Sequence, residues 1–203
     1  MVSSTKPTAY TTKELSANTW NDFEKLAAQQ GTCWCTYYQR PKPVHRGKLP
    51  REQVKKDNQL FKRSLLEQGQ AHAALVYHDD RPVGWCQYGV KEELPRIDAG
   101  RNYRKLEPVS GDRKLWRITC FWVDKEYRGK GVAKFALKAA LDSIKRNGGG
   151  IVEAYPVVSK KMAAVPEWRW FGTPKMFERE NFKPVAPLGT SLMLMRKTIT
   201  SKS

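Results

Sequence analysis

Residues 123–133 read Val123-Asp124-Lys125-Glu126-Tyr127-Arg128-Gly129-Lys130-Gly131-Val132-Ala133, a strand end that passes through a basic, glycine-containing turn into a helix. Most residues from Leu115 to Val123 are apolar or aromatic, which predicts a central strand buried on both faces. After the turn, apolar residues recur at helical spacing and predict a helix from near Gly131 to Asn147. Strict alternation places Ile118, Cys120 and Trp122 on one side of the strand and Thr119, Phe121 and Val123 on the other.

The turn after this strand has the chemistry of an anion-binding site. The first N–H groups of a helix lack intrahelical acceptors, and the helix dipole adds partial positive charge there. Gly129 and Gly131 have no side chains to hold a phosphate away, and Arg128, Lys130 and Lys134 add full charges. The alternative is an ordinary strand-to-helix turn with solvated basic residues. A Rossmann fingerprint needs glycine where Lys134 stands, and the Gly-Lys-Ser/Thr of a P-loop is absent.

Arg128, Gly131 and Ala133 form the pattern Arg-x-x-Gly-x-Ala between the apolar strand and the amphipathic helix. A glycine-rich turn at 148–150 and a second apolar strand at 151–155 follow. This arrangement resembles motif A of the GCN5-related N-acetyltransferases (GNAT), whose turn binds the pyrophosphate of acetyl-CoA. The resemblance implies that acetyl-CoA is the cofactor.

The resemblance also implies the GNAT fold, an α/β structure with a mixed α+β sheet. We expect a mostly antiparallel central sheet with one splayed parallel strand pair, flanked by about four helices. The likeness covers nearly the whole chain, which we interpret as a single domain at 1–203 with long insertions at about 91–114 and 156–170. We expect helices at 16–30, 50–68, 131–147 and 174–180, and strands at 8–15, 71–77, 83–90, 115–123, 151–155 and within 183–199. The inner residues expected for the second helix are Val54, Leu60, Phe61, Leu65 and Leu66.

In the family, a bulge interrupts the pairing of the two parallel strands, and the pantetheine arm of the cofactor enters the gap. Here, backbone groups at 121–123 would bind the pantetheine amides, and the N–H of Val123 would polarise the thioester carbonyl. The cofactor-binding residues implied by the resemblance are Phe121, Trp122, Val123, Arg128, Gly129, Lys130, Gly131, Val132 and Ala133.

The implied reaction is direct attack of an amine on the acetyl group in a ternary complex. One proton leaves the amine and another goes to the departing thiolate. Many relatives use a tyrosine for the second transfer, but this chain has Phe177 there, and Asn181 in place of a glycine of the same pattern. Glu153 and Tyr155 share a strand face and are the candidate catalytic residues, and Cys120 is a further candidate acid by position. The alternatives are a solvated or ion-paired Glu153, a Tyr155 that only packs, and a structural thiol at Cys120.

An aromatic-walled pocket for a smallish amine is expected around the thioester. Trp34, Tyr37 and Tyr38 lie between the first two predicted helices, and Trp168 and Trp170 lie in the second insertion. We predict that these five residues bind the substrate. The alternative for each of them is that it fills the core.

The composition limits the classes of partner. Thirty-seven Lys and Arg residues against 20 Asp and Glu give a net charge of +17, but no dense basic tract is present, so nucleic acid is expected to bind only non-specifically. No apolar run predicts a membrane span, and we expect a cytoplasmic protein. The four cysteines are scattered, which predicts reduced thiols and no metal site.

The first functional hypothesis is an N-acetyltransferase that acts on a small-molecule amine. Acetylation of a protein or peptide is an open alternative. A basic, non-catalytic binding module with the GNAT fold is another, favoured by Phe177 and the high positive charge. A homodimer is also left open.

Overall fold

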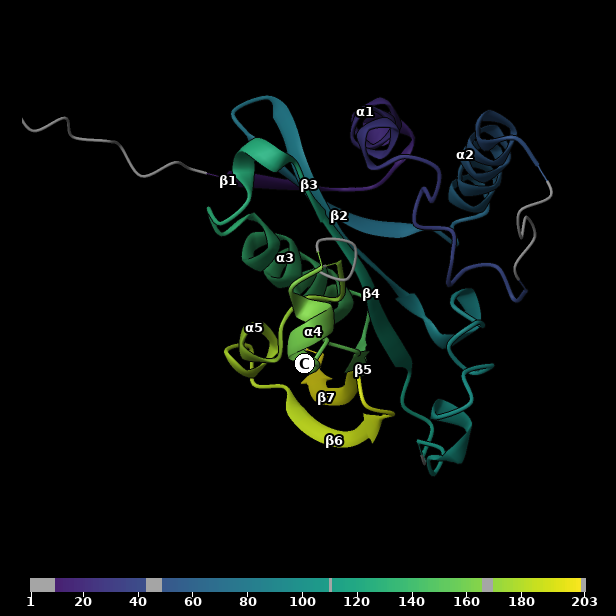
Figure 1. The fold of residues 1–203 in the computed structure, drawn as a ribbon. Coiled ribbons are helices and arrows are strands. Elements are labelled where there is room, and N and C mark those ends of the chain that lie inside the picture. The colour runs from purple at the N-terminus through teal and green to yellow at the C-terminus, as the bar shows by residue number, and fades with distance from the viewer. Residues whose placement is uncertain (1–9, 43–48, 110, 166–169, 202–203) are drawn as a thin grey trace, which may run out of the picture.

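The computed structural model describes residues 10–42, 49–109, 111–165 and 170–201, which form one seven-stranded sheet with helices on both faces (Figure 1). Within these residues, no helix is long and apolar enough to span a membrane. The strands are β1 (Tyr10–Glu14), β2 (His72–His78), β3 (Arg81–Val90), β4 (Leu115–Val123), β5 (Gly149–Ala154), β6 (Lys183–Leu188) and β7 (Leu192–Thr200). The α-helices are α1 (Trp20–Gln30), α2 (Arg51–Glu67), α3 (Val132–Arg146), α4 (Lys160–Ala163) and α5 (Pro174–Glu178).

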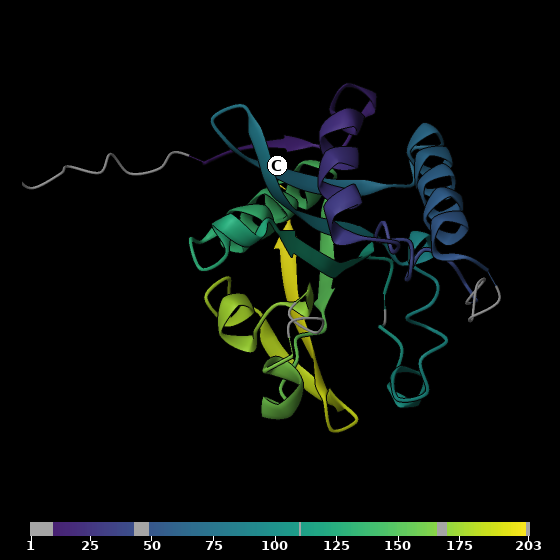
Figure 2. The ribbon, with the colours of Figure 1, turned by 45° about the horizontal axis from the view of Figure 1, so that its top comes forward.

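The strand order in the sheet is β1-β2-β3-β4-β5-β7-β6, and only β4 and β5 run parallel. The predicted mixed, mostly antiparallel sheet is therefore confirmed. Helix α3 covers one face of the sheet, and α1 and α2 lie on the other (Figures 1 and 2). The core residues divide in the same way, because the apolar side of α3 packs with one cluster and that of α1 with another.

Strands β4 and β5 separate partway along their length. They pair from Leu115 with Ile151 to Ile118 with Ala154, where β5 ends, while β4 continues to Val123. Beyond Ile118, β4 pairs only with β3. We call residues 115–118 the paired half of β4 and residues 119–123 its open half.

A β-bulge lies at the boundary between the two halves. Gln87 of β3 pairs with Cys120 and Tyr88 pairs with Ile118, so Thr119 is an extra residue on β4. The bulge reverses the alternation of side chains along the strand. Ile118 packs with Phe121 in the core under α3, whereas Cys120 packs in the core under α1. The prediction that Ile118 shares a face with Cys120 and Trp122 is therefore wrong.

The inner face of helix α2 is partly polar. Leu65 and Leu66 pack against the core under α1 as predicted, but polar side chains that the hydrophobic pattern did not predict are also buried there. Its buried residues are Asn58 and Lys62, while Leu60, expected to face inward, is 59% exposed. The reason is that α2 packs on the loop after α1. Asn58 Nδ2 donates to the Thr32 carbonyl, and Lys62 Nζ donates to Gln39 Oε1 at 2.9 Å.

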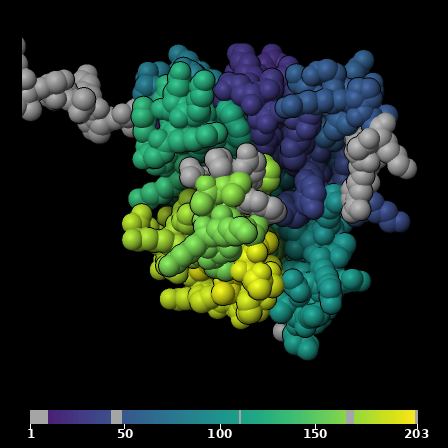
Figure 3. Space-filling model, viewed as in Figure 1, coloured from purple at the N-terminus to yellow at the C-terminus, as the bar shows by residue number. Residues whose placement is uncertain are grey.

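The two long connections contain short ordered elements. Residues 91–109 include two 3₁₀ turns, Lys91–Glu93 and Tyr103–Lys105, and the second connection includes α4. The first connection lies beside the C-terminal strands (Figure 3), and an added Cβ on Gly189 in the β6–β7 turn would meet Asn102 Nδ2 at 2.8 Å. This connection therefore forms one wall of the region next to the end of β5.

Candidate active site

The turn between β4 and α3 leaves open space in front of its backbone. Gly131 is the N-cap of α3 with φ 86°, and Gly129 has φ 77°, both in the left-handed region that favours glycine. A Cβ added to either glycine would meet no atom within 4 Å. Arg128 Nε donates to the Val123 carbonyl at 3.3 Å, and Lys130 Nζ lies 5.3 Å from the centre of the Tyr127 ring. Together with the unbonded first N–H groups of α3, these residues fit a pyrophosphate.

The open half of β4 offers backbone groups to a bound molecule. Asp124 N donates to the Val83 carbonyl on the β3 side, and because N–H directions alternate along a strand, those of Val123 and Phe121 point to the free edge. The predicted cofactor residues here use their side chains for packing. Trp122 stacks on Trp85 with ring centres 5.2 Å apart, and Phe121 and Val132 are buried.

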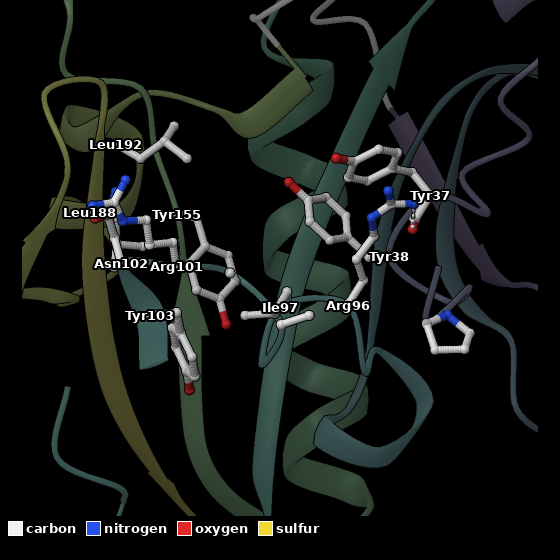
Figure 4. A pocket seen from close by; sticks show the side chains of 13 residues that line it. Tyr37, Tyr38, Arg96, Ile97, Arg101, Asn102, Tyr103, Tyr155, Leu188 and Leu192 are labelled. Atoms are coloured by element: carbon white, nitrogen blue, oxygen red, sulfur yellow. Dashed lines mark hydrogen bonds between the residues drawn. The ribbon is translucent and has the colours of Figure 1, made fainter. Parts of the chain in front are cut away.

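Two cavities lie beside this region and share Tyr37 and Tyr38 as lining residues. The larger, the tyrosine cavity, has a volume of about 410 Å³ and is also lined by Tyr103 and Tyr155 (Figure 4). The smaller, the thiol cavity, has a volume of about 300 Å³. Its other lining residues are Gln30, Cys33, Cys35, Thr119, Cys120, Trp170 and Phe171.

Glu153 is fully buried in a network of hydrogen bonds behind the wall of the tyrosine cavity. Its Oε2 accepts from the hydroxyls of Tyr103 at 2.7 Å and Tyr155 at 2.8 Å. Its Oε1 accepts from Arg196 Nε at 2.9 Å, and Arg117 Nε lies 3.8 Å from Oε2. Glu153 is therefore ion-paired with basic residues, as the alternative prediction stated. Tyr155, the other predicted catalytic residue, lines the cavity and bonds Glu153.

Both tyrosines of this network stay protonated near neutral pH. Burial, followed by the hydrogen bond to Glu153, raises the pKa of Tyr103 to about 12. Burial and the Glu153 charge raise the pKa of Tyr155 well above its usual value. The Tyr103 oxygen already accepts from Arg117 Nη2 at 3.2 Å. The Tyr155 hydroxyl donates to Glu153, and its oxygen can accept from a group in the cavity.

Arg117 fixes the first insertion against this network. Its side chain is fully buried and forms a bidentate pair with Asp98, with N–O distances of 2.9 and 2.6 Å. It also donates to the Leu94 carbonyl at 3.0 Å. Burial lowers the pKa of Arg117, but the Asp98 hydrogen bonds and the neighbouring tyrosines outweigh it and raise the pKa overall. The arginine is a permanent positive charge that ties the insertion to the sheet.

The predicted aromatic residues are distributed between cavity and core. Tyr37 and Tyr38 line both cavities, and Trp170 lines the thiol cavity. Trp34 is 1% exposed, stacks on Trp20 with ring centres 6.2 Å apart and lines neither cavity, so the alternative that it fills the core describes its position. Trp168 lies outside the described residues.

Several residues of this site were missed by the sequence analysis. Tyr103 lies in an insertion without periodicity, and Arg196 lies on the last strand, so neither gave a local signal. Arg117 did give one, because a charged residue within an otherwise apolar strand needs a buried partner.

Comparison with known proteins agrees with this geometry. The family model of the acetyltransferase (GNAT) family matches residues 17–172. The chain belongs to the GNAT family. The match includes the glycine turn, the open half of β4 and all of β5.

Solved GNAT-like structures share the fold at low sequence identity. A Desulfovibrio desulfuricans protein described as an acetyltransferase of the GNAT family has 14% identity and a TM-score of 0.54, covering 94% of this chain and 99% of its own. An N-acetyltransferase from Staphylococcus aureus Mu50 has 13% identity and a TM-score of 0.52, covering 96% and 99%.

The PaiA N-acetyltransferase from Thermoplasma acidophilum, in complex with coenzyme A, has 12% identity and a TM-score of 0.51, covering 94% of this chain and 99% of its own. No curated protein matches the sequence significantly. At these identities the neighbours show the fold alone, so the acceptor must be argued from the site.

Proposed function

We propose that this GNAT-family protein transfers the acetyl group of acetyl-CoA to an amine of a small molecule, by direct attack in a ternary complex. The observation that carries the proposal is the free edge of β4. At one end this edge meets the basic glycine turn. At the other end Thr119 and Cys120 line the thiol cavity, which shares Tyr37 and Tyr38 with the tyrosine cavity of about 410 Å³. A cavity of this size suits a small acceptor.

In this proposal, bound acetyl-CoA supplies an activated acetyl thioester. Arg128, Lys130 and the N–H groups that open α3 bind its pyrophosphate, with Gly129 and Gly131 leaving room for it. The free N–H groups of Phe121 and Val123 orient the arm and polarise the thioester carbonyl. The side chains of Trp122, Val132 and Ala133 support this backbone by packing.

The proton of the amine passes to Glu153 through Tyr155. Tyr155 lines the cavity, and its hydroxyl already donates to Glu153 Oε2 at 2.8 Å. It can therefore accept a proton from the amine as it passes its own proton on. Glu153 itself does not line the cavity, so a direct transfer to it is not part of the proposal. Phe177 has no ionisable proton to transfer and is fully buried.

The proposal is tested by measuring free-thiol release from acetyl-CoA across a panel of small amines and peptides. Small amines are expected to react fastest. Faster reaction with peptides would support protein acetylation instead. Binding of acetyl-CoA without thiol release from any acceptor would support a non-catalytic module.

Tyr155 and Tyr103 both donate to Glu153 Oε2, so substituting each of them in turn tests whether the proton passes through Tyr155. Tyr155→Phe and Glu153→Gln are each expected to lower kcat about 100-fold or more, and the double variant should be no slower than either one. Tyr103→Phe removes the equivalent hydrogen bond at 2.7 Å and serves as the control. Equal losses in Tyr103→Phe and Tyr155→Phe, or an unaltered rate and pH profile in Glu153→Gln, would overturn the route.

A further inference from the structure

The tyrosine cavity contains two arginines and, among its 13 described lining residues, no carboxylate (Figure 4). These arginines are Arg96 and Arg101. Neither has an Asp or Glu within ion-pair distance in the described parts of the chain. Arg117, by contrast, is neutralised by Asp98 outside the cavity. The cavity therefore has a net positive charge, because none of its described lining residues is an Asp or Glu that would neutralise the two arginines.

Arg96 is held in a fixed orientation. Its guanidinium carbon lies 3.8 Å from the centre of the Tyr37 ring, and its Nη1 donates to the Tyr37 carbonyl at 3.3 Å. Stacking of this kind fixes the plane of the guanidinium, and four further N–H donors are left for other partners. A fixed planar fork is suited to a carboxylate or phosphate.

Arg101 lies across the cavity from Arg96, with Tyr155 between them (Figure 4). It belongs to the first insertion and neighbours Asn102, another lining residue that lies against the β6–β7 turn. The insertion is anchored by the buried Arg117–Asp98 pair, so its backbone is set firmly beside the cavity. The first insertion thus brings both cations to the cavity that Tyr155 lines.

We infer that the acceptor amine also carries an anionic group, a carboxylate or a phosphate, which Arg96 and Arg101 bind while the amine faces Tyr155. This inference rests on the proposed function and names the class of its substrate. A polycation such as a polyamine would meet two like charges without a neutralising carboxylate in the described walls and is therefore rejected.

The test compares acceptors that differ only in the anion. L-Phenylalanine is paired with L-phenylalaninamide, and O-phosphoethanolamine with ethanolamine, with spermidine as the polycation. The anionic member of at least one pair is expected to have a kcat/KM about 10-fold or more higher, since a charged hydrogen bond is worth about one such factor. The pair with the larger ratio distinguishes a carboxylate from a phosphate.

Arginine variants assign the preference to the cavity. Arg96→Gln and Arg101→Gln should each reduce the ratio of kcat/KM between the anionic and the neutral acceptor about 10-fold, by raising the KM for the anionic acceptor. Arg104 is an exposed arginine of the same insertion that does not line this cavity, and Arg104→Gln should leave the ratio unchanged. Turnover that favours the amides or spermidine would overturn the inference and leave the acetyltransferase proposal standing. Bound acetyl-CoA without turnover of any acceptor would overturn both.

A second, independent observation concerns the thiol cavity. The Sγ atoms of Cys35 and Cys120 lie 2.8 Å apart, although 85 positions separate the two residues in the sequence. A disulfide bond is about 2.05 Å long, so a small movement would join the two atoms. Both cysteines line a cavity of about 300 Å³, which gives a small oxidant a place beside them.

The surroundings of Cys35 favour its thiolate. Its Sγ accepts from Trp85 Nε1 at 3.2 Å and from Gln30 Nε2 at 3.7 Å, and it lies within hydrogen-bond distance of Cys120 Sγ. Burial raises the pKa of Cys35, but these hydrogen bonds and the charge of Lys62 outweigh it, and the pKa is lowered overall. A thiolate is the reactive form of cysteine toward peroxide.

The backbone holds Cys35 in this position at a cost. Both Trp34 and Cys35 have φ 51°, in the left-handed region that residues other than glycine seldom adopt. The buried Trp34 ring, packed on Trp20 and Phe23, keeps the loop in this conformation. The loop therefore directs the Cys35 sulfur at Cys120 through strain that the core maintains.

We propose that Cys35 and Cys120 are a peroxide-sensitive dithiol. The Cys35 thiolate attacks hydrogen peroxide, forming a sulfenic acid and releasing hydroxide. The Cys120 sulfur then attacks the Cys35 sulfur, which forms the S–S bond and, with the proton of Cys120, expels water. The bond ties the loop after α1 to the open half of β4, beside the proposed acyl-donor site.

The test treats the reduced chain with hydrogen peroxide and maps its peptides without reduction. The expected product has lost two hydrogens, contains a Cys35–Cys120 linked peptide and is restored by dithiothreitol. Cys35→Ser should prevent the link, while Cys86→Ala, which removes a buried thiol outside the cavity, should form it as the native chain does. Cys33→Ser should also form it.

A link to Cys33 in place of Cys120, or oxidation of Cys35 no faster than that of Cys86, would overturn the proposal. Melting temperatures of the reduced variants show whether each one is folded before oxidation. The disulfide is expected to raise the melting temperature of the native chain by roughly 5–10 °C, because it closes a long loop.

Discussion

The two halves of β4 belong to one strand but have opposite environments. In the paired half, β3 and β5 bond both edges, and Arg117 has carboxylate partners. In the open half, among the described residues, only β3 bonds the strand and the buried Thr119 hydroxyl has no partner. The thiols of Cys35 and Cys120 face each other in a cavity there. In the paired half, Arg117 Nε has no hydrogen bond among the described residues but lies 3.8 Å from Glu153 Oε2, whereas the open half presents polar groups that a ligand can satisfy.

Two fully buried cations show the same difference. Arg117 beside the paired half bonds Asp98, and its pKa is raised overall despite burial. Lys62 lies beside the open half, where its Nζ donates to the amide oxygens of Gln39 and Gln87, and burial lowers its pKa to about 8. Arg117, which has a carboxylate partner, stays charged and stabilises the fold. Lys62, which is bonded by neutral amides, can lose its proton near pH 8 close to the candidate site.

The strongest test of the paired half is Arg117→Met. It leaves Asp98 without its bidentate partner and removes one of the two cations near the buried Glu153. The free energy of unfolding should fall by about 3–5 kcal/mol, measured by urea denaturation. Arg104→Met, on the exposed surface of the same insertion, should change it by less than about 0.5 kcal/mol. Similar losses in both variants would mean that Arg117 has no special structural role.

The next test uses the titration of Lys62. Its pKa is about 8 in the folded chain and 10.5 ordinarily, so between these values the unfolded chain binds more protons and stability rises with pH. The unfolding free energy of the native chain relative to Lys62→Met should therefore increase by up to about 3 kcal/mol from pH 8 to 10.5. Lys56→Met, on the exposed side of α2, should show no such change. If the difference in unfolding free energy between the native chain and Lys62→Met does not change with pH, the pKa of Lys62 is not lowered by burial.

A third test probes the turn at the end of the open half. Gly131→Asp should abolish stabilisation by acetyl-CoA, which for the native chain at about 100 times Kd amounts to about 2.7 kcal/mol. The control is Gly131→Ala, because both variants bear the strain of φ 86° and only Asp adds negative charge. Thermal shift with and without acetyl-CoA measures the effect. Retained stabilisation in Gly131→Asp would contradict the proposed pyrophosphate position.

The smallest effect is expected at the boundary of the two halves. Thr119→Val removes a buried hydroxyl without a hydrogen-bond partner and should stabilise the ligand-free chain by up to about 1 kcal/mol. Thr36→Val removes a hydroxyl that bonds the Cys33 carbonyl and Asn58, and should destabilise it by about 1–3 kcal/mol. Equal destabilisation by the two changes would show that the Thr119 hydroxyl is satisfied in solution.

The sequence predicted the elements whose periodicity is strong. Strand β4 has the predicted bounds, and α3 begins one residue after Gly131 and ends one before Asn147, because glycine and asparagine punctuate a clear helical pattern. The bulge at Thr119 was not predictable, since it depends on how β3 pairs with β4. The burial of Lys62 on α2 was missed because its two acceptors, Gln39 and Gln87, come from a loop and from strand β3, which no pattern within α2 encodes.

The candidate site was predictable where its chemistry is local. The glycine turn carries its own pattern, and Tyr37 and Tyr38 lie in a dense aromatic segment. The partners of Glu153 come from three distant segments, at Tyr103, Arg117 and Arg196. Such contacts arise from the topology of the sheet, and no spacing within one segment encodes them.

The single extra residue at Thr119 also governs how β4 tolerates change. Because it shifts the alternation by one position, polar substitutions should follow one odd–even rhythm up to Ile118 and the reversed rhythm from Cys120 onward. Deleting residue 119 would remove the bulge, so Cys120 would follow Ile118 in regular alternation and keep its place on the α1 side, facing Cys35. The residues of the open half would therefore keep their faces, and a single alternation would run through the whole strand.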